Sequence, residues 1–144
     1  KKINIFKLTD YIASIVPLGQ AIGRWGNYIN IEAYGVETSL PIKMKIIENG
    51  ITKYVHPTFL YESIGDFVLF LLLLKISKKT KFSGQITFLY FIGYSFLRFF
   101  IEGLRTDSLM LGYIRASQLL SLIIFIVFSI LYIIKKKNIS KSQM

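Results

Sequence analysis

The sequence contains no cysteine, and this absence excludes several kinds of chemistry. A chain without cysteine forms no disulfide, has no thiolate nucleophile of its own and builds no Cys-based metal site. The motifs of P-loop NTPases (GKS), zinc proteases (HExxH) and serine hydrolases (GxSxG) are also absent, and so are clusters with metal-ligand spacing. No metal site is therefore predicted.

Acidic residues are scarce: 8 Asp and Glu stand against 18 Lys and Arg, so the net charge is +10. Such an excess suits nucleic acid or anionic lipid as a partner. Because 53% of the 144 residues are hydrophobic, too many for an ordinary soluble domain, we favour membrane lipids and expect no nucleic-acid partner. The chain begins with Lys and shows no signal peptide, and we interpret it as a piece of a longer chain.

Four stretches suggest membrane-spanning helices, since a bilayer core about 30 Å thick needs roughly 20 apolar helical residues. Three are continuous, and the first is interrupted by Pro17 and by glycines, which membrane bundles tolerate. We therefore predict an all-α integral membrane protein, a polytopic helical bundle that forms a single transmembrane domain over residues 1–144. Its spans are expected at about 11–31, 57–76, 84–103 and 113–134.

Lysines predict the orientation of these spans. They are concentrated before the first span, between the second and third, and after the last, and they are Lys1, Lys2, Lys7, Lys75, Lys78, Lys79, Lys81, Lys135, Lys136, Lys137 and Lys141. Because basic residues mark the cytoplasmic side, both ends of this chain are predicted to face the cytoplasm. The connections 32–56 and 104–112 are predicted to face outward.

Charged and polar residues inside the predicted spans fall at one depth. Arg24 and Arg98 lie about 20 Å above the inner ends of their spans, at 1.5 Å of rise per residue. Glu62 lies about 9 Å below the outer end of its own span by the same measure. His56 and Tyr61 fall in the same outer half, so three helices are expected to bring polar side chains together.

Two of these features have a purely structural interpretation that stays open. Arg98 and Glu102, at i and i+4, suit an internal ion pair, and Arg105 at i+7 is expected on the same helix face. His56, which stands before Pro57, suits a structural cap at the start of the second span, with a role as acid or base as the alternative.

Arg24 favours a functional interpretation over a purely structural one, because a second cation at the same depth needs an anion of its own. The candidates are Glu62, Asp66 or a bound ligand. Arginine donates hydrogen bonds as a planar fork, so two arginines with Asn27 and Asn30 as further donors suit a phosphate. At this depth, a phosphate is most naturally that of a phospholipid headgroup.

Three motifs resemble those of the bacterial prolipoprotein diacylglyceryl transferases. The stretch GRWGNYINIEAYG (23–35) fits the pattern Gly-Arg-x-Gly-Asn-aromatic-x-Asn-x-Glu-x-x-Gly. HPTFLYES (56–63) resembles the family's His-Pro-x-x-Leu-Tyr-Glu element, and RFFIEGLRTD (98–107) resembles its Arg-Phe-x-x-Glu-x-x-Arg element. Ser117-Gln118 fits the opening of the final span. The family is normally longer, so its first spans are missing here, and Gly103-Leu104 stands where the family often has two aromatics.

The resemblance implies an enzyme of the bacterial cytoplasmic (inner) membrane. Such a transferase moves the diacylglyceryl group of phosphatidylglycerol onto the lipobox cysteine of a prolipoprotein signal peptide and releases glycerol phosphate. This is the first step of lipoprotein maturation. The chemistry it implies needs neither a metal nor another cofactor. A non-enzymatic membrane transporter, or another anion-binding membrane protein, is the rival interpretation.

The resemblance also implies a set of site residues. The expected catalytic residues are Arg24, Arg98 and His56. The expected substrate-binding residues are Arg24, Asn27, Asn30, Glu32, Gly35, Tyr61, Glu62, Arg98, Glu102 and Arg105. The arginines are expected to stabilise charge on the leaving phosphate, with Glu32 and Glu102 holding them in place. The general base stays unassigned, although His56 is a possibility.

Overall fold

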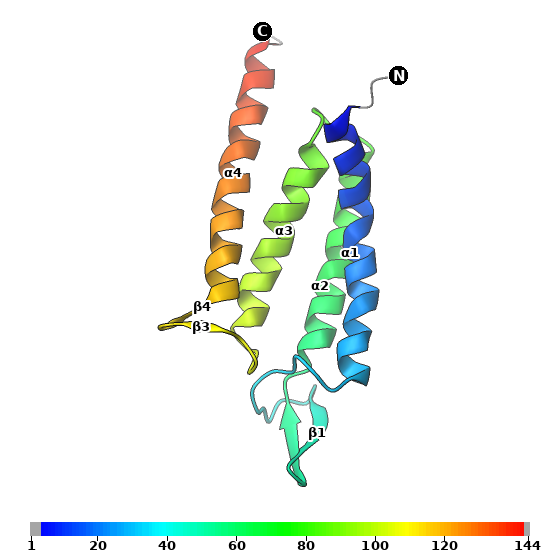
Figure 1. Cartoon of the computed structure of the whole chain (residues 1–144). Coiled ribbons are helices and arrows are strands. Elements are labelled where there is room, and N and C mark those ends of the chain that lie inside the picture. The colour runs from blue at the N-terminus through cyan, green and yellow to red at the C-terminus, as the bar shows by residue number, and fades with distance from the viewer. Residues whose placement is uncertain (1–3, 143–144) are drawn as a thin grey trace.

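The computed structural model describes residues 4–142, which form four helices and two short β-hairpins (Figure 1). In chain order the elements are α1 (Ile5–Ile29), β1 (Met44–Glu48), β2 (Ile51–Val55), α2 (Thr58–Ser77), α3 (Gln85–Glu102), β3 (Met110–Leu111), β4 (Ile114–Arg115) and α4 (Ala116–Ser142). Lys1 and Lys2, which were part of the orientation argument, lie outside the described residues.

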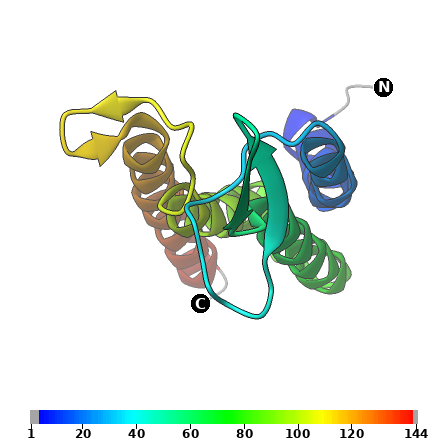
Figure 2. The same cartoon turned by 90° about the horizontal axis from the view of Figure 1, so that it is seen from below.

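The helices run side by side, and the connections collect at two ends (Figure 1). α1, α2 and α3 pack against one another, whereas α4 packs mainly on α3. Both hairpins lie at one end, which we call the hairpin end; Figure 2 views the molecule from this side. The start of α1, the connection between α2 and α3 and the last turns of α4 lie at the other end, which we call the lysine end.

The four helices overlap the four stretches expected from the sequence, with shifts at their boundaries. α1 begins at Ile5 rather than near residue 11, because the Asn4 side chain accepts a hydrogen bond from Phe6 N at 3.0 Å and caps the helix. α4 begins at Ala116 rather than 113, because the preceding residues form a hairpin with Gly112 at a φ of 65°.

Within residues 4–142, one helix is long and apolar enough by itself to cross a membrane, over Ala116–Lys141. The other three carry charged side chains along their length, including Asp10 and Arg24 in α1, Glu62 and Asp66 in α2. The structure therefore shows a mostly helical chain with one candidate span.

The expectation of an all-α chain misses the two hairpins. β1 and β2 pair antiparallel, from Met44 opposite Val55 to Glu48 opposite Ile51. Asn49 and Gly50 form the turn with φ values of 51° and 78°, the positive angles that a two-residue hairpin turn requires. Met44 and Ile46 are buried and alternate with the exposed Lys45. They pack one face of this hairpin over Phe59 at the start of α2.

A small apolar core joins α1, α2 and α3. It contains Ala13, Leu69, Leu73 and Ile86, all buried. Gly93 lets α3 approach α2 closely, since a Cβ built there would lie 2.5 Å from Leu69 Cδ1. This close approach brings the polar faces of the same helices within contact distance nearer the hairpin end.

α1 and α3 are also tied together at the lysine end. Asp10 of α1 accepts hydrogen bonds from Gly84 N at 2.7 Å and Thr87 N at 2.9 Å. α3 has no side-chain cap of its own, because Gly84 is its N-cap residue with a φ of 94°. A side chain distant in sequence therefore satisfies two N–H groups at the start of this helix.

Candidate functional site

Glu62 of α2 lies between two arginines from different helices. Its Oε2 pairs with Nε of Arg24 on α1, and its Oε1 pairs with Nη1 of Arg98 on α3. The Glu62 side chain is 6% exposed, whereas the arginine side chains are 20% and 18% exposed. The guanidinium groups thus meet at one buried carboxylate while part of each still reaches the surface.

Arg98 is held by a second carboxylate as well. Glu102 stands one turn further along α3, and its Oε2 lies 2.7 Å from Arg98 Nη2, in an ion pair whose angle falls outside hydrogen-bond geometry. Arg115 of β4 donates a hydrogen bond to the Glu102 backbone oxygen. We call Arg24, Glu62, Arg98 and Glu102 the arginine cluster; its two cations face two anions.

A third buried acid lies one helical turn from Glu62. Asp66 shares the same face of α2 by its i, i+4 spacing, and it is 2% exposed. Its Oδ2 has no hydrogen-bond donor among the described residues. Asp66 was one candidate for the anion that pairs with Arg24, and the structure gives that contact to Glu62.

Tyrosines extend the polar face of α3 beyond the arginine cluster. Arg24 Nη2 donates to the Tyr94 hydroxyl at 3.5 Å, and Tyr90 donates to Gln20 Oε1 at 3.3 Å. The rings of Tyr90 and Tyr94 stack with centroids 5.7 Å apart. Gln20 and the two tyrosines were not expected in the site, and for the tyrosines the sequence held a signal. Their spacing was a usable signal, since Tyr90, Tyr94, Arg98 and Glu102 repeat every four residues along one helix face.

The segment 33–36 fastens the first motif to the other two. Gly35 N donates to His56 O at 3.0 Å, and Val36 N donates to Leu104 O at 2.8 Å. Thr58 Oγ1 donates to Ala33 O. The end of the first motif therefore lies between the start of α2 and the chain just after α3.

His56 and Tyr61 contact each other beside this segment. His56 Nδ1 lies 3.2 Å from the Tyr61 hydroxyl. The interpretation of His56 as a helix cap is wrong, because Pro57 is the N-cap residue of α2 and no side chain caps that helix. The ring is instead half-buried and anchored by a tyrosine one turn into the helix.

Asn27, Asn30 and Glu32 lie near the end of α1, and they are less closely joined to the cluster. Asn30 Nδ2 donates to Glu32 Oε1 at 3.2 Å, and both residues are exposed. Among the described contacts Glu32 does not hold an arginine, so that part of the expectation is wrong. Ile31 and the residue after Glu32 take positive φ angles, which turn the chain away from the helix axis. Asn27 is half-buried, and its three-residue spacing from Arg24 puts both on one face of α1.

Arg105 was expected on the same helix face as Arg98, and the structure contradicts this. α3 ends at Glu102, so Arg105 lies beyond it in the connection. There it makes a two-pronged contact with Asp107, with Nε to Oδ1 at 2.9 Å and Nη2 to Oδ2 at 2.7 Å. The Arg105 guanidinium lowers the pKa of Asp107 below its ordinary value.

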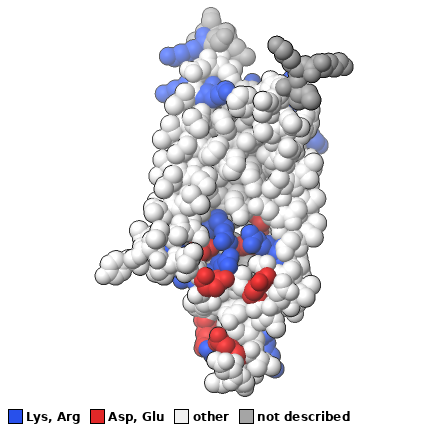
Figure 3. All heavy atoms as spheres, viewed as in Figure 1, with Lys and Arg blue, Asp and Glu red and all other residues white. Residues whose placement is uncertain are grey.

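Basic and acidic residues lie together in one hollowed region of the surface, apart from the lysines at the lysine end and the charges on the lower hairpin (Figure 3). Figure 3 shows blue and red atoms together toward the hairpin end, where the face is hollowed, and a mostly uncharged surface between this region and the lysine end. Charged side chains of both signs are therefore accessible on this face of the molecule.

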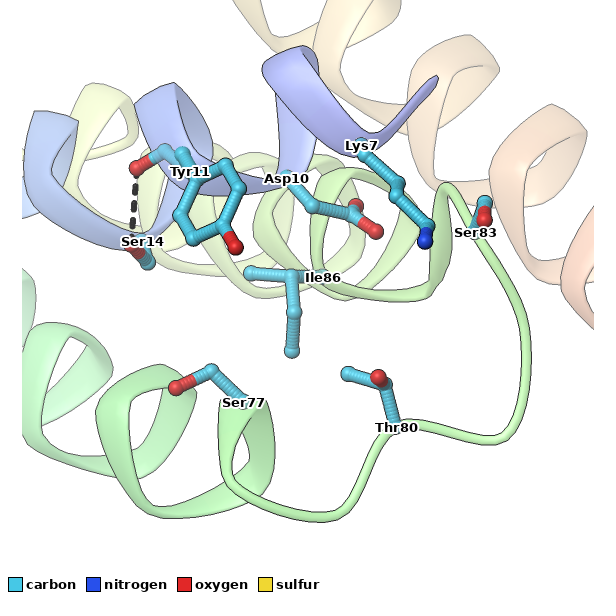
Figure 4. A pocket seen from close by; sticks show the side chains of 8 residues that line it. All are labelled: Lys7, Asp10, Tyr11, Ser14, Ser77, Thr80, Ser83 and Ile86. Carbon is cyan, nitrogen blue, oxygen red and sulfur yellow. Dashed lines mark hydrogen bonds between the residues drawn. The ribbon is translucent and has the colours of Figure 1, made fainter. Parts of the chain in front are cut away.

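A separate cavity of about 300 Å³ lies at the lysine end (Figure 4). Its walls come from α1, the end of α2, the following connection and α3, and they include Lys7, Asp10, Tyr11, Ser77, Thr80 and Ser83. Asp10 is already engaged in capping α3. None of the predicted site residues lines this cavity, so the arginine cluster remains the candidate site.

Comparison with known proteins agrees with the three motifs. The sequence model of the family described as prolipoprotein diacylglyceryl transferase matches residues 1–134. Proteins named phosphatidylglycerol–prolipoprotein diacylglyceryl transferase are similar to the chain. That of Finegoldia magna is 54% identical over 144 residues, 99% of this chain and 56% of the relative. That of Clostridioides difficile is 54% identical over 123 residues, 85% of this chain and 48% of the relative.

A third relative with the same name, from Thermotoga petrophila, is 49% identical over 130 residues, 85% of this chain and 44% of the relative. The chain thus spans about half the length of the curated relatives that it matches. The family match covers nearly all of the chain, including the helices that carry the arginine cluster. The chain therefore belongs to the prolipoprotein diacylglyceryl transferase family.

Proposed function

We propose that this chain carries part of the active site of an enzyme that lipidates bacterial prolipoproteins. The enzyme transfers the diacylglyceryl group of phosphatidylglycerol to the lipobox cysteine thiol and releases glycerol phosphate. One observation carries this proposal: arginines from α1 and α3 converge on a single carboxylate within a chain of this family. The names of the relatives supply the two substrates.

The proposed setting is the bacterial cytoplasmic membrane, with all four helices spanning it. α4 is apolar enough to do so alone. α1–α3 direct their charges toward one another, as charged groups inside a membrane must. The connection between α2 and α3 and the last turns of α4 carry lysines and lie at one end of the molecule, which favours a cytoplasmic lysine end. The hairpin end then faces outward.

In this proposal the arginine pair binds the lipid phosphate. A carboxylate and a phosphodiester each offer two oxygens to the planar fork of an arginine, so Glu62 marks the point where the two guanidinium groups can share one anion. The exposed parts of Arg24 and Arg98 then contact the phosphate. Asn27 shares a face of α1 with Arg24 by its three-residue spacing, and Asn30 and Glu32 lie just beyond the end of that helix.

The reaction makes one bond and breaks one. The cysteine sulfur attacks the glyceryl carbon that carries the phosphate, the S–C bond forms, and the C–O bond breaks with its electron pair passing to the phosphate oxygen. Because negative charge grows on this oxygen, two fixed cations stabilise the transition state more than the bound lipid. Arg24 and Arg98 take this role, and Glu102 is a positioning residue for Arg98.

The thiol must lose its proton, since the thiolate is the nucleophile. We assign the proton acceptor to His56, whose Nδ1 faces the Tyr61 hydroxyl at 3.2 Å, which leaves Nε2 for the thiol. Gly35, which is buried against His56, keeps the ring near the first motif. Arg105 lies in the connection that pairs with the Gly35 segment, and we propose that it contributes to substrate binding from there. The mechanism uses no metal or cofactor.

The test is a transfer assay with the full-length protein reconstituted in vesicles of phosphatidylglycerol and phosphatidylcholine. A peptide with a lipobox cysteine should gain a diacylglyceryl group, and the same peptide with Ser in place of the cysteine should not. Vesicles of phosphatidylcholine alone should support no transfer. A folded protein that binds phosphatidylglycerol but modifies no peptide would contradict the enzymatic proposal and favour an anion-binding membrane protein.

A further inference from the structure

A short hairpin between α3 and α4 exposes almost only apolar side chains. Leu109 is 81% exposed, Tyr113 is fully exposed, and the other large apolar side chains there are also exposed; they are Met110, Leu111 and Ile114. The sequence from 108 to 114, SLMLGYI, contains no charged residue. We call residues 109–114 the apolar hairpin.

The backbone of the apolar hairpin is held by regular strand pairing. Met110 pairs with Arg115, and Leu111 pairs with Ile114, across a turn in which Gly112 has a φ of 65°. Ala116 N donates to Leu109 O at 2.9 Å, which closes the base of the hairpin onto the first residue of α4. In Figures 1 and 2 the hairpin projects sideways from the start of α4, away from the other helices.

Its root is attached to the candidate site. Arg115, the last residue of β4, donates a hydrogen bond to the backbone oxygen of Glu102. Glu102 in turn holds Arg98. The position of the apolar hairpin is thereby coupled to the end of α3 that carries the arginine cluster.

The environment of this hairpin follows from its place on α4. α4 is the candidate membrane span, and only 6% of its most apolar window is buried within the protein. The apolar hairpin continues that uncovered surface sideways at the point where the helix would leave the hydrocarbon. Aromatic side chains with a polar tip favour this level of a membrane, and apolar neighbours favour burial just below it.

We propose that the apolar hairpin inserts into the outer interface of the lipid bilayer, with the Tyr113 hydroxyl at the level of the headgroups. The proposal rests on the membrane-spanning arrangement proposed above. The partner is lipid rather than protein, because the hairpin has no charged side chain and only one side-chain hydroxyl, at Tyr113, with which to specify a protein. By holding Arg115, the hairpin fixes the depth of the arginine cluster below the outer headgroups.

The test uses spin labels on the full-length protein in vesicles of phosphatidylglycerol and phosphatidylcholine. This chain contains no cysteine, and any cysteine elsewhere in the protein is first replaced by Ser. Labels are placed at Tyr113→Cys, at Ile47→Cys and at Leu120→Cys. Ile47 is an exposed apolar residue of β1, 68% exposed, so it is a matched control outside the proposed lipid contact, and Leu120 reports on α4 itself.

Collisions with oxygen and with a water-soluble nickel chelate then give the depth of each label. The label at 113 should collide more with oxygen than the label at 47, and at least several-fold less with the chelate. Equal access of the chelate to positions 113 and 47 would overturn the proposal. So would a label at 113 shielded from both reagents, because protein would then cover it. If the label at 120 collides with oxygen and not with the chelate, α4 lies in the membrane, and a failure at 113 then concerns the apolar hairpin alone. None of these measurements depends on transfer activity.

Discussion

Gly35 and His56 are packed so closely that a Cβ built on Gly35 would lie 2.7 Å from His56 Cβ. The same added atom would lie 3.0 Å from the Leu104 backbone oxygen and 3.2 Å from Thr58 Cγ2. Segments from all three motifs therefore meet at this one position. A side chain there would push apart the proposed proton acceptor and the chain that follows α3.

Gly35→Ala should therefore lower both stability and transfer. Overpacking of this kind costs about 1–3 kcal/mol, and movement of His56 should reduce transfer further than the loss of folded protein explains. Gly19→Ala is the matched control, because a Cβ there would meet nothing within 4 Å. Thermal unfolding and transfer rate are measured for both. Equal behaviour of the two variants would contradict the packing argument.

Arg24→Lys should fold and lose most of its transfer activity. Lysine keeps the charge but lacks the planar fork with which Arg24 contacts Glu62 and Tyr94. The rate should fall by at least about tenfold, which corresponds to about 1.4 kcal/mol of transition-state stabilisation. Binding of phosphatidylglycerol, measured separately, should fall less than the rate. Wild-type turnover in this variant would exclude a shared phosphate at the arginine pair.

Glu102→Gln should reduce transfer less than Arg98→Ala does. The amide keeps the shape of Glu102 and removes its charge, while Arg98 still has Glu62 as a partner. A positioning role predicts a lower rate with an unchanged pH profile. A greater loss in Glu102→Gln than in Arg98→Ala, with a changed pH profile, would instead indicate proton transfer by Glu102 itself.

Cysteines at Asn49 and Lys79 should react from opposite sides of the membrane. Asn49 is in the turn between β1 and β2, and Lys79 is in the connection between α2 and α3; both are exposed. An impermeant thiol reagent added outside whole cells should label Asn49→Cys and leave Lys79→Cys unmodified until the cells are opened. Labelling of both from outside would overturn the proposed orientation.

The contact of Arg105 with Asp107 should add a pH-dependent term to stability. Because the pKa of Asp107 is lower in the folded protein than its ordinary value of 3.8, this contact stabilises the fold above that value. The contribution is lost as the pH falls through the lowered pKa. Melting temperatures from pH 7 to pH 3 should therefore drop more in wild type than in Asp107→Asn. Parallel curves would show that the contact adds no stability.

The sequence was sufficient to predict the four helices, though not their exact ends, because their apolar runs are long. It also predicted that Arg24, Arg98 and Glu62 meet, since helical rise alone places them at one depth. It did not predict Arg105 beyond the end of α3, because periodicity says nothing about where a helix stops when Gly103 is the only breaker. The cap of α3 by Asp10 depends on contacts between residues distant in sequence, which no local pattern encodes.

The hairpin at 44–55 was not predicted, for a different reason. Asn49-Gly50 between alternating apolar residues predicts a two-residue turn, and the pattern was present in the sequence. The two strands are five residues each, and this short signal stands between much longer apolar runs. Tyr94 was also not predicted in the site, because it stands in an apolar run and its hydroxyl contact with Arg24 joins helices distant in sequence.

The ion pairs of the arginine cluster have a consequence for how the protein is made. All four side chains of the cluster lie before Gly103, whereas α4 begins at Ala116 and packs mainly on α3. A growing chain therefore carries every cation and its counter-ion before the ribosome has translated α4. Arg24 is the exception in timing, because it enters the insertion machinery before Glu62 has been synthesised. If these helices span the membrane as proposed, α1 has to reach lipid either with an unpaired Arg24 or together with α2, whose Glu62 neutralises it.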